Sequence, residues 1–255
     1  MELEDSHQRL LDKASKDLAK YCYVLWDYFN FPELTTIKTI NDSILVVYEN
    51  HIFFSGRPNK EIITSNNFVG DLSLSFEKSW LGLIKMYFFN FSPVTSPAIA
   101  WYNHFFCMEL KKENFNNVIN EFESIRLQEE HLSYLSIKRQ IHYSLGPATA
   151  VIKNNQLIAC AFAPHILNMA GFSYGVIRDV WTAPEWRGRG LGTDVTEHLC
   201  KILFDMGLNR IFLWVEKNNK AAIRVYNKLG FEVKSEILSA FASFRGKDAS
   251  TVVFV

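Results

Sequence analysis

The sequence has no excess of charge of either sign, since 27 basic residues balance 27 acidic residues over a length of 255. A chain without a net positive field has no general attraction for nucleic acid or an acidic membrane surface. No apolar run approaches the roughly 20 residues that a membrane-spanning helix needs. Residues 1–18 alternate in charge and lack the apolar centre of a signal peptide, so we expect a cytoplasmic protein.

Paired metal-ligand spacing is also missing. The four cysteines are far apart in the chain, and the seven histidines show no recurring interval. We therefore expect no metal, and we expect reduced thiols that pack like small apolar side chains. Cys200 in particular is expected to be packed rather than nucleophilic.

The N-terminal part combines helical and strand patterns. Apolar residues recur at steps of three and four from Leu10 to Phe29, which predicts one long helix. Three short β-type runs follow, at 35–40, 43–49 and 51–56. A second helical pattern runs from Phe76 to Tyr87, with Ser75 as its N-cap.

Residues 90–98 carry two prolines and no periodicity, so we place a boundary there, between domains 1–98 and 99–255. In the second domain the patterns predict helices at 115–126 and 129–143, one ended by Gly207, and one that starts after Asn219 and stops at Gly230. Strands are predicted at 104–110, 148–153, 157–163, 174–182, 210–216, 231–238 and 250–255. The fold class is therefore α/β with a mixed sheet, and inspection reveals no internal repeat.

Three of the glycines fall within "WRGRGLGT", residues 186–193, between a strand pattern and a helix pattern. Glycines at a helix entrance let the backbone approach a ligand closely, and the helix start offers unpaired N–H groups and a positive dipole end. Such a turn is an anion cradle, usually for phosphate. Arg187 and Arg189 add cations that suit phosphate. The alternative, a loop without a ligand, explains one glycine better than three.

Common nucleotide motifs do not fit this cluster. No Gly-Lys-Ser/Thr follows, as a Walker loop requires, and the spacing G-x-G-x-x-G fails from both Gly188 and Gly190.

The cluster instead resembles the acetyl-CoA signature of the GNAT N-acetyltransferases, R/Q-x-x-G-x-G/A, at Arg187, Gly190 and Gly192. Further on, "NKAAIRVYNKLGF" is similar to that family's second motif, N-x-x-A-x-x-x-Y-x-x-x-G-F. Its matching residues are Asn219, Ala222, Tyr226, Gly230 and Phe231. The clear resemblance covers about residues 176–233 and implies a GNAT fold for the second domain. The first domain is similar in layout to a degenerate GNAT copy that lacks the coenzyme loop.

The resemblance implies that acetyl-CoA is the co-substrate and that an amine attacks it directly in a ternary complex. The backbone of the loop would hold the pyrophosphate, and its residues are Arg187, Gly188, Arg189, Gly190, Leu191, Gly192 and Thr193. The backbone at Trp181 and Thr182 would pair with the pantetheine arm and polarise the thioester carbonyl.

Proton transfer is assigned to two residues. Tyr226 is the expected general acid toward the thiolate, and its alternative is simple packing with Ala222 and Leu229. Asp179 is the candidate general base, because it is the only carboxylate in residues 174–182; pairing with Arg178 or a neighbouring strand is its alternative. Asn219 would contact the coenzyme or cap its helix.

The sequence therefore predicts an acetyl-CoA-dependent N-acetyltransferase that acts on a primary amine. The acceptor, a small molecule or a peptide N-terminus, stays open, as does a homodimer. A non-catalytic acyl-CoA sensor is the main alternative, and an RNA-binding arginine-glycine cluster is a weaker one, given the neutral charge.

Overall fold

The computed structural model describes residues 2–95, 100–118 and 122–245. Internal contacts divide the chain into unit 1, which is Met1–Phe106 with Ser235–Val255, and unit 2, which is Cys107–Lys234. The boundary predicted after Ala98 falls on residues 96–99, outside the described residues, as does the strand predicted at 250–255. The C-terminal stretch belongs with unit 1 because its strand, β12, pairs with strands of that unit.

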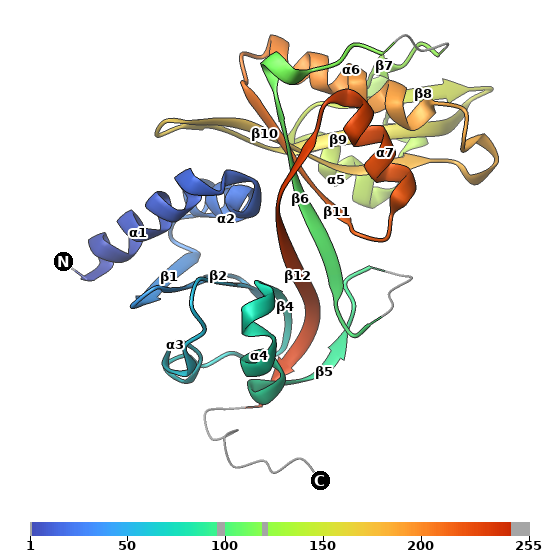
Figure 1. The fold of residues 1–255 in the computed structure, drawn as a ribbon. Helices are drawn as coiled ribbons and strands as arrows, with labels where there is room; N and C mark the ends of the chain where they lie inside the picture. The colour runs from blue at the N-terminus through green and yellow to red at the C-terminus, as the bar shows by residue number, and fades with distance from the viewer. Residues whose placement is uncertain (1, 96–99, 119–121, 246–255) are drawn as a thin grey trace. The chain divides into compact units, whose positions relative to one another are not determined.

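Unit 1 is an α/β unit with a mixed sheet. Its elements are α1 (Glu2–Lys16), α2 (Leu18–Asn30), β1 (Thr35–Ile40), β2 (Ser43–Tyr48), β3 (His51–Ser55), α3 (Lys60–Thr64), β4 (Asp71–Phe76), η1 (Lys78–Trp80), α4 (Leu81–Tyr87), β5 (Phe88–Ser92) and, from Ser235 onward, β12 (Glu232–Phe244). Strands β1, β2 and β3 pair antiparallel, β3 pairs parallel with β4, and β12 pairs antiparallel with β4 and β5. Figure 1 shows α1 and α2 on one face of strands β1–β4 and α3 on the other. Phe54, Phe76 and Trp80 are fully buried in the core of this unit.

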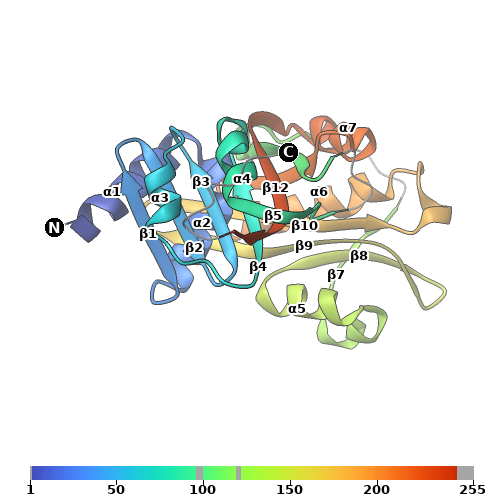
Figure 2. The ribbon, with the colours of Figure 1, turned by 90° about the horizontal axis from the view of Figure 1, so that it is seen from below.

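Unit 2 repeats this order of pairings. Its elements are, from Cys107 onward, β6 (Asn103–Lys111), then η2 (Lys112–Asn114), β7 (Ile125–Arg126), η3 (Glu129–Tyr134), α5 (Ile137–Leu145), β8 (Ala148–Lys153), β9 (Gln156–Met169), β10 (Phe172–Thr182), η4 (Pro184–Trp186), α6 (Leu191–Asp205), β11 (Arg210–Glu216) and α7 (Lys220–Leu229). Strands β8, β9 and β10 pair antiparallel, and β10 pairs parallel with β11. Helices α5 and α6 cover opposite faces of these strands (Figure 2).

The predicted mixed α/β class is confirmed. Strand β11 lies inside the sheet, and its residues Ile211, Phe212 and Leu213 are buried, as its uninterrupted apolar pattern predicts. Helix α7 begins after Asn219 and is followed by Gly230 at φ 98°, so both predicted ends are confirmed.

The single helix predicted from Leu10 to Phe29 is wrong. The chain breaks at Asp17, whose backbone leaves the helical region at φ −143° and ψ 64°. The Asp17 side chain accepts a hydrogen bond from the Lys20 amide at 3.2 Å and so caps a new helix, α2. A short acidic side chain that bonds to nearby amides favours such a start over a helix interior.

Three further helix predictions are corrected. Ser75 is not an N-cap, because β4 continues through it to Phe76 in parallel pairing with β3, and the helical turns start at Lys78. The described part of 115–126 contains no helix and ends in strand β7. The helix predicted at 129–143 is divided into η3 and α5 at Leu135 and Ser136.

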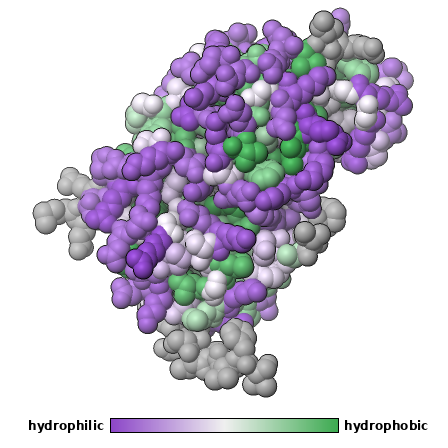
Figure 3. Space-filling view, viewed as in Figure 1, coloured by the Kyte–Doolittle hydropathy of each residue, from purple (hydrophilic) through white to green (hydrophobic). Residues whose placement is uncertain are grey.

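The face drawn in Figure 3 is largely hydrophilic, and its hydrophobic residues form small separate patches. Among the described residues no helix is both long and apolar enough to cross a membrane.

Candidate active site

The glycine cluster forms the entrance to α6. Gly188 and Gly190 have φ values of 77° and 90°, in the left-handed region that glycine adopts without strain. A Cβ atom placed on either residue would meet no atom within 4 Å, so the space above the turn is open. Thr193 and Asp194 donate their amides to the Gly190 carbonyl at 2.9 and 3.0 Å. The amides that precede Thr193 at the helix start have no carbonyl within the helix to bond.

The end of β10 is attached to this turn. Arg187 donates from Nε to the Thr182 carbonyl at 3.2 Å, and a Cβ on Gly192 would lie 3.6 Å from the Thr182 hydroxyl. The structure therefore places Thr182 against the loop.

Two cations flank the Trp186 ring beside the loop. The Arg189 guanidinium lies 4.8 Å from the ring centroid, and the Lys153 ammonium lies 4.9 Å from it. Arg189 also donates to the Glu185 carbonyl at 3.3 Å. Lys153 comes from β8, and no sequence motif connects it with the loop. The glycine loop therefore has a third cation near it, Lys153, that the sequence interpretation missed.

Strands β10 and β11 pair only at their beginnings. The parallel register covers Tyr174–Val176 against Arg210–Phe212, although β10 continues to Thr182 and β11 to Glu216. Beyond Val176 the pairing with β9 is irregular, with shifts on both sides of Arg178. Asp179 adopts a φ of 50° within this β-bulge. Beyond Val176, no strand among the described residues pairs with the edge of β10 that faces β11, and Trp181 and Thr182 lie on this part of the strand.

The bulge gathers charged and titratable side chains from α5 and β10. Arg139 of α5 donates from Nε to Asp179 Oδ2 at 3.2 Å, and its guanidinium lies 4.5 Å from the Trp181 ring centroid. His142, also on α5, places Nδ1 3.8 Å from Asp179 Oδ2. Asp179 therefore has an ion-pair partner on helix α5, a source that the sequence interpretation did not consider.

Burial lowers the pKa of both histidines in this region. It lowers the pKa of His142, with a further decrease caused by the Arg178 charge and an increase caused by Asp179. It lowers the pKa of His165 to about 3, again with Arg178 contributing. Both imidazoles are therefore neutral at pH 7.

Helix α7 supplies the second motif. Tyr226 is 7% exposed, and its ring lies 5.7 Å from that of Phe231. Asn219 accepts from the Ala222 amide at 3.1 Å, so its side chain caps the helix. Helix α7 packs against α6, the helix that begins at the loop. Cys200 on α6 is fully buried, and burial raises the pKa of its thiol, consistent with packing.

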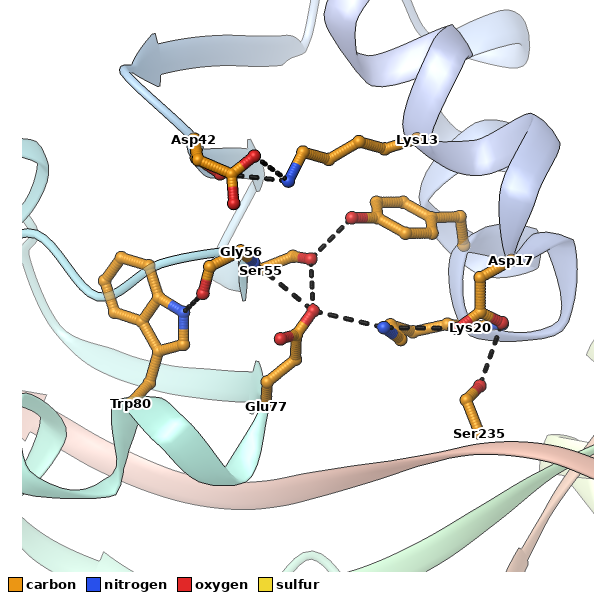
Figure 4. A network of polar contacts seen from close by, with 10 residues as sticks. Lys13, Asp17, Lys20, Asp42, Ser55, Gly56, Glu77, Trp80 and Ser235 are labelled. Carbon is orange, nitrogen blue, oxygen red and sulfur yellow. Dashed lines mark hydrogen bonds and ion pairs between the residues drawn. The ribbon is translucent and has the colours of Figure 1, made fainter.

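In unit 1 the turn between β3 and α3 holds the place that the glycine loop holds between β10 and α6 in unit 2. Side chains of the protein itself bond to this turn (Figure 4). Glu77 accepts hydrogen bonds at Oε1 from the Gly56 amide at 3.3 Å, from the Ser55 hydroxyl at 2.5 Å and from Lys20 at 3.1 Å. The Trp80 indole donates to the Gly56 carbonyl at 3.0 Å. The Gly56 amide, the first after strand β3, is therefore already bonded to a carboxylate of the protein itself, Glu77.

The N-terminus of α3, the helix after that turn, is also unsuited to binding an anion. Helix α3 spans five residues, and its start is capped by Asn59, which accepts from the Glu61 amide at 2.9 Å. Helix α6 in unit 2 spans 15 residues and begins at a glycine that has no side chain to cap it.

Comparison with known proteins links the second unit to one family. The family described as "Acetyltransferase (GNAT) family" matches residues 107–231. Mycothiol acetyltransferase of Corynebacterium jeikeium is 44% identical over 64 residues, which cover 25% of this chain and 19% of that protein. Spermidine N(1)-acetyltransferase of Escherichia coli K12 is 38% identical over 64 residues, or 23% and 32% of the two chains. The matches thus span a third or less of these relatives.

Solved structures extend the similarity of fold to most of the chain. A Drosophila protein covers 95% of this chain, with 97% of its own length aligned, at a TM-score of 0.63 and 12% identity. A GNAT-family acetyltransferase from Colwellia psychrerythraea covers 91%, with 97% of its own length, at a TM-score of 0.54 and 15% identity.

Proposed function

Residues 107–231 are a GNAT acetyltransferase domain, and on that premise we propose that the protein transfers an acetyl group from acetyl-CoA to a primary amine. The observation that supports this most is the open, left-handed turn of Gly188 and Gly190 at the start of α6. Open space above amides at a helix N-terminus suits a pyrophosphate.

The coenzyme would lie along the loop and the free edge of β10. Amides between Gly188 and Thr193 would bind the pyrophosphate, and Arg187 and Arg189 would add charge-assisted hydrogen bonds. The backbone at Trp181 and Thr182 would bond to the pantetheine arm, because β11 has left that edge before these residues. An amide from the same edge would stabilise the oxyanion that forms on the thioester carbonyl.

The amine would attack the thioester carbon directly, without an acyl-enzyme. Tyr226 would protonate the departing thiolate, whose pKa is comparable with the ~8.5 of a cysteine thiol. Asp179 lies two residues before Trp181, where the thioester carbonyl is expected, and it would take part in removing the proton from the amine. A sensor that binds acetyl-CoA without turnover would need neither group.

The test of coenzyme binding compares two glycines in the same backbone conformation. Gly190→Leu and Gly207→Leu each place a side chain at a left-handed residue with open space around it, at the start and just beyond the end of α6. Each substitution costs about 1–2 kcal/mol in backbone strain. We expect only Gly190→Leu to weaken acetyl-CoA binding, by tenfold or more in calorimetry, because its side chain fills the pyrophosphate position.

Equal coenzyme affinity in both variants and in the wild type would contradict a site at the loop. Release of free coenzyme A in the presence of primary amines then separates the transferase from the sensor.

A further inference from the structure

His142 is a buried histidine that the sequence motifs do not explain. Its side chain comes from α5, is 9% exposed as a residue, and lies with its ring 6.0 Å from that of Phe162. Its Nδ1 is buried and has no hydrogen-bond partner among the described residues; Asp179 Oδ2 is the nearby acceptor at 3.8 Å. A buried polar atom left in this way costs free energy. In this chain the atom faces a carboxylate that lies in a strained bulge beside the expected reaction centre.

We infer that His142 is the residue that takes the proton from the attacking amine, with Asp179 as the group that stabilises the resulting imidazolium. This inference rests on the proposed transferase function. A carboxylate at Nδ1 leaves Nε2 as the nitrogen that receives the proton, which is the arrangement of a histidine supported by an acidic partner. The 3.8 Å gap would close as positive charge develops on the ring, since catalytic hydrogen bonds often tighten only in the reacting complex.

Asp179 alone is less suited to this role. Its Oδ2 already accepts a hydrogen bond from Arg139 at 3.2 Å, so the guanidinium occupies the oxygen that also faces His142. Arg139 in turn lies against Trp181, so the ion pair is held on the strand that carries the predicted pantetheine contacts. Arg139 and Asp179 thus act as positioning residues for the imidazole.

Burial, together with the nearby cations, keeps His142 neutral before the reaction. Arg178 and Asp179 of β10, Lys138 and Arg139 of α5, and His165 of β9 all influence this region. Burial has the largest effect on the pKa of His142 and lowers it; Arg178, Lys138 and Arg139 lower it further, while Asp179 raises it. The free imidazole can therefore accept a proton across the physiological pH range.

The ammonium of the acceptor gives one proton to His142 Nε2, which later releases it to solvent. The nitrogen then forms a bond with the thioester carbon, and the bond from that carbon to sulfur breaks. Tyr226 protonates the thiolate, and the second nitrogen proton restores the phenol. The products are the acetamide, coenzyme A with a free thiol, and one proton.

The first experiment compares His142→Gln with His198→Gln, the same substitution on α6, where the original side chain bonds to Ser124. Release of coenzyme A is followed with spermidine, glucosamine and alanine amide as probe amines. We expect His142→Gln to lower kcat/KM at least 100-fold at pH 7 with unchanged affinity for acetyl-CoA, as a lost general base does. The defect should shrink above pH 9, where more of the amine is already neutral. His198→Gln should behave as the wild type.

The second experiment needs no turnover. NMR titration of the His142 ring should give a lower pKa in Asp179→Asn and a higher pKa in Arg178→Met than in the wild type, because each variant removes one charge of opposite sign. The acid limb of the pH profile of kcat/KM should move to lower pH in Asp179→Asn and to higher pH in Arg178→Met.

The outcomes are separable. An active wild type matched by His142→Gln overturns the inference and leaves the proposed function intact, and so does a His142 pKa that neither charge variant changes. A wild type that releases no coenzyme A with any probe, and does not bind acetyl-CoA, contradicts the proposed function itself.

Discussion

Tyr226 on α7 has two possible roles, general acid and packing residue, and its burial is compatible with both. A phenol that is 7% exposed and near Phe231 packs well, and it can also donate a proton within a site that excludes water. The hydroxyl, rather than the ring, distinguishes these roles.

Tyr226→Phe removes only that hydroxyl. We expect turnover to fall at least tenfold, about 1.4 kcal/mol on the barrier, while acetyl-CoA affinity stays the same, because the ring and its packing are kept. The rate should be measured where chemistry limits it. Tyr174→Phe removes another buried hydroxyl in unit 2 and serves as the control. Wild-type turnover in Tyr226→Phe would leave the residue as a packing group.

Residues in a local motif were predictable, whereas residues that meet through the fold were not. Gly190, Asn219 and Gly230 have the conformations or caps that their places in the sequence predict. Arg139 and Asp179 are 40 residues apart and meet because α5 packs on β9 next to β10. No spacing rule connects a helix residue with a bulge on another element, so this part of the candidate site needed the structure.

At the scale of elements, the sequence predicts strands with strong β patterns well, whereas two helices predicted as continuous are divided in the structure. The runs that became β1, β2, β3, β8 and β11 were predicted close to their observed bounds. Strand β4 was missed because its extended form depends on parallel pairing with β3, which periodicity within residues 71–76 does not reveal. The division of α1 from α2 depends on one side-chain cap at Asp17.

The start of α7 offers a test of whether Asn219 serves the helix or the coenzyme. Asn219→Ala removes the acceptor for the Ala222 amide, so we expect it to lower the free energy of unfolding by about 1 kcal/mol. Asn219→Asp keeps the cap and should be near wild type, since a negative charge is favourable at a helix N-terminus. Denaturant unfolding measures both variants.

Coenzyme affinity provides the second reading of these variants. If Asn219→Ala weakens acetyl-CoA binding tenfold without any loss of stability, the side chain contacts the coenzyme and the capping explanation is wrong.

At the scale of the whole molecule, the two units share an order of strand pairings that inspection of the sequence did not reveal. In each unit three antiparallel strands lead to a turn, a helix and a parallel strand. The likeness of the first domain to a degenerate copy stays a prediction, with which this shared order of pairings agrees. Its turn is closed by Glu77 and Trp80, whereas the turn in unit 2 is open.

We therefore expect one molecule of acetyl-CoA per chain. The Gly56 amide already bonds to Glu77, and α3 is too short and too well capped to hold a pyrophosphate. Calorimetry of the full chain should give a stoichiometry of one, and Gly190→Leu should abolish that single binding event. A second binding event that persists in the variant would assign a coenzyme site to unit 1.

The bulge on β10 also restricts how this protein can evolve. At a φ of 50° the backbone of residue 179 favours glycine, asparagine or aspartate, since other side chains crowd the following carbonyl. The Arg139 guanidinium requires a negative charge at the same place. Glutamate meets only the second demand, and asparagine and glycine meet only the first. Aspartate alone meets both, so exchanges that are conservative elsewhere would be selected against at this codon, and the position should stay fixed among descendants that keep the ion pair.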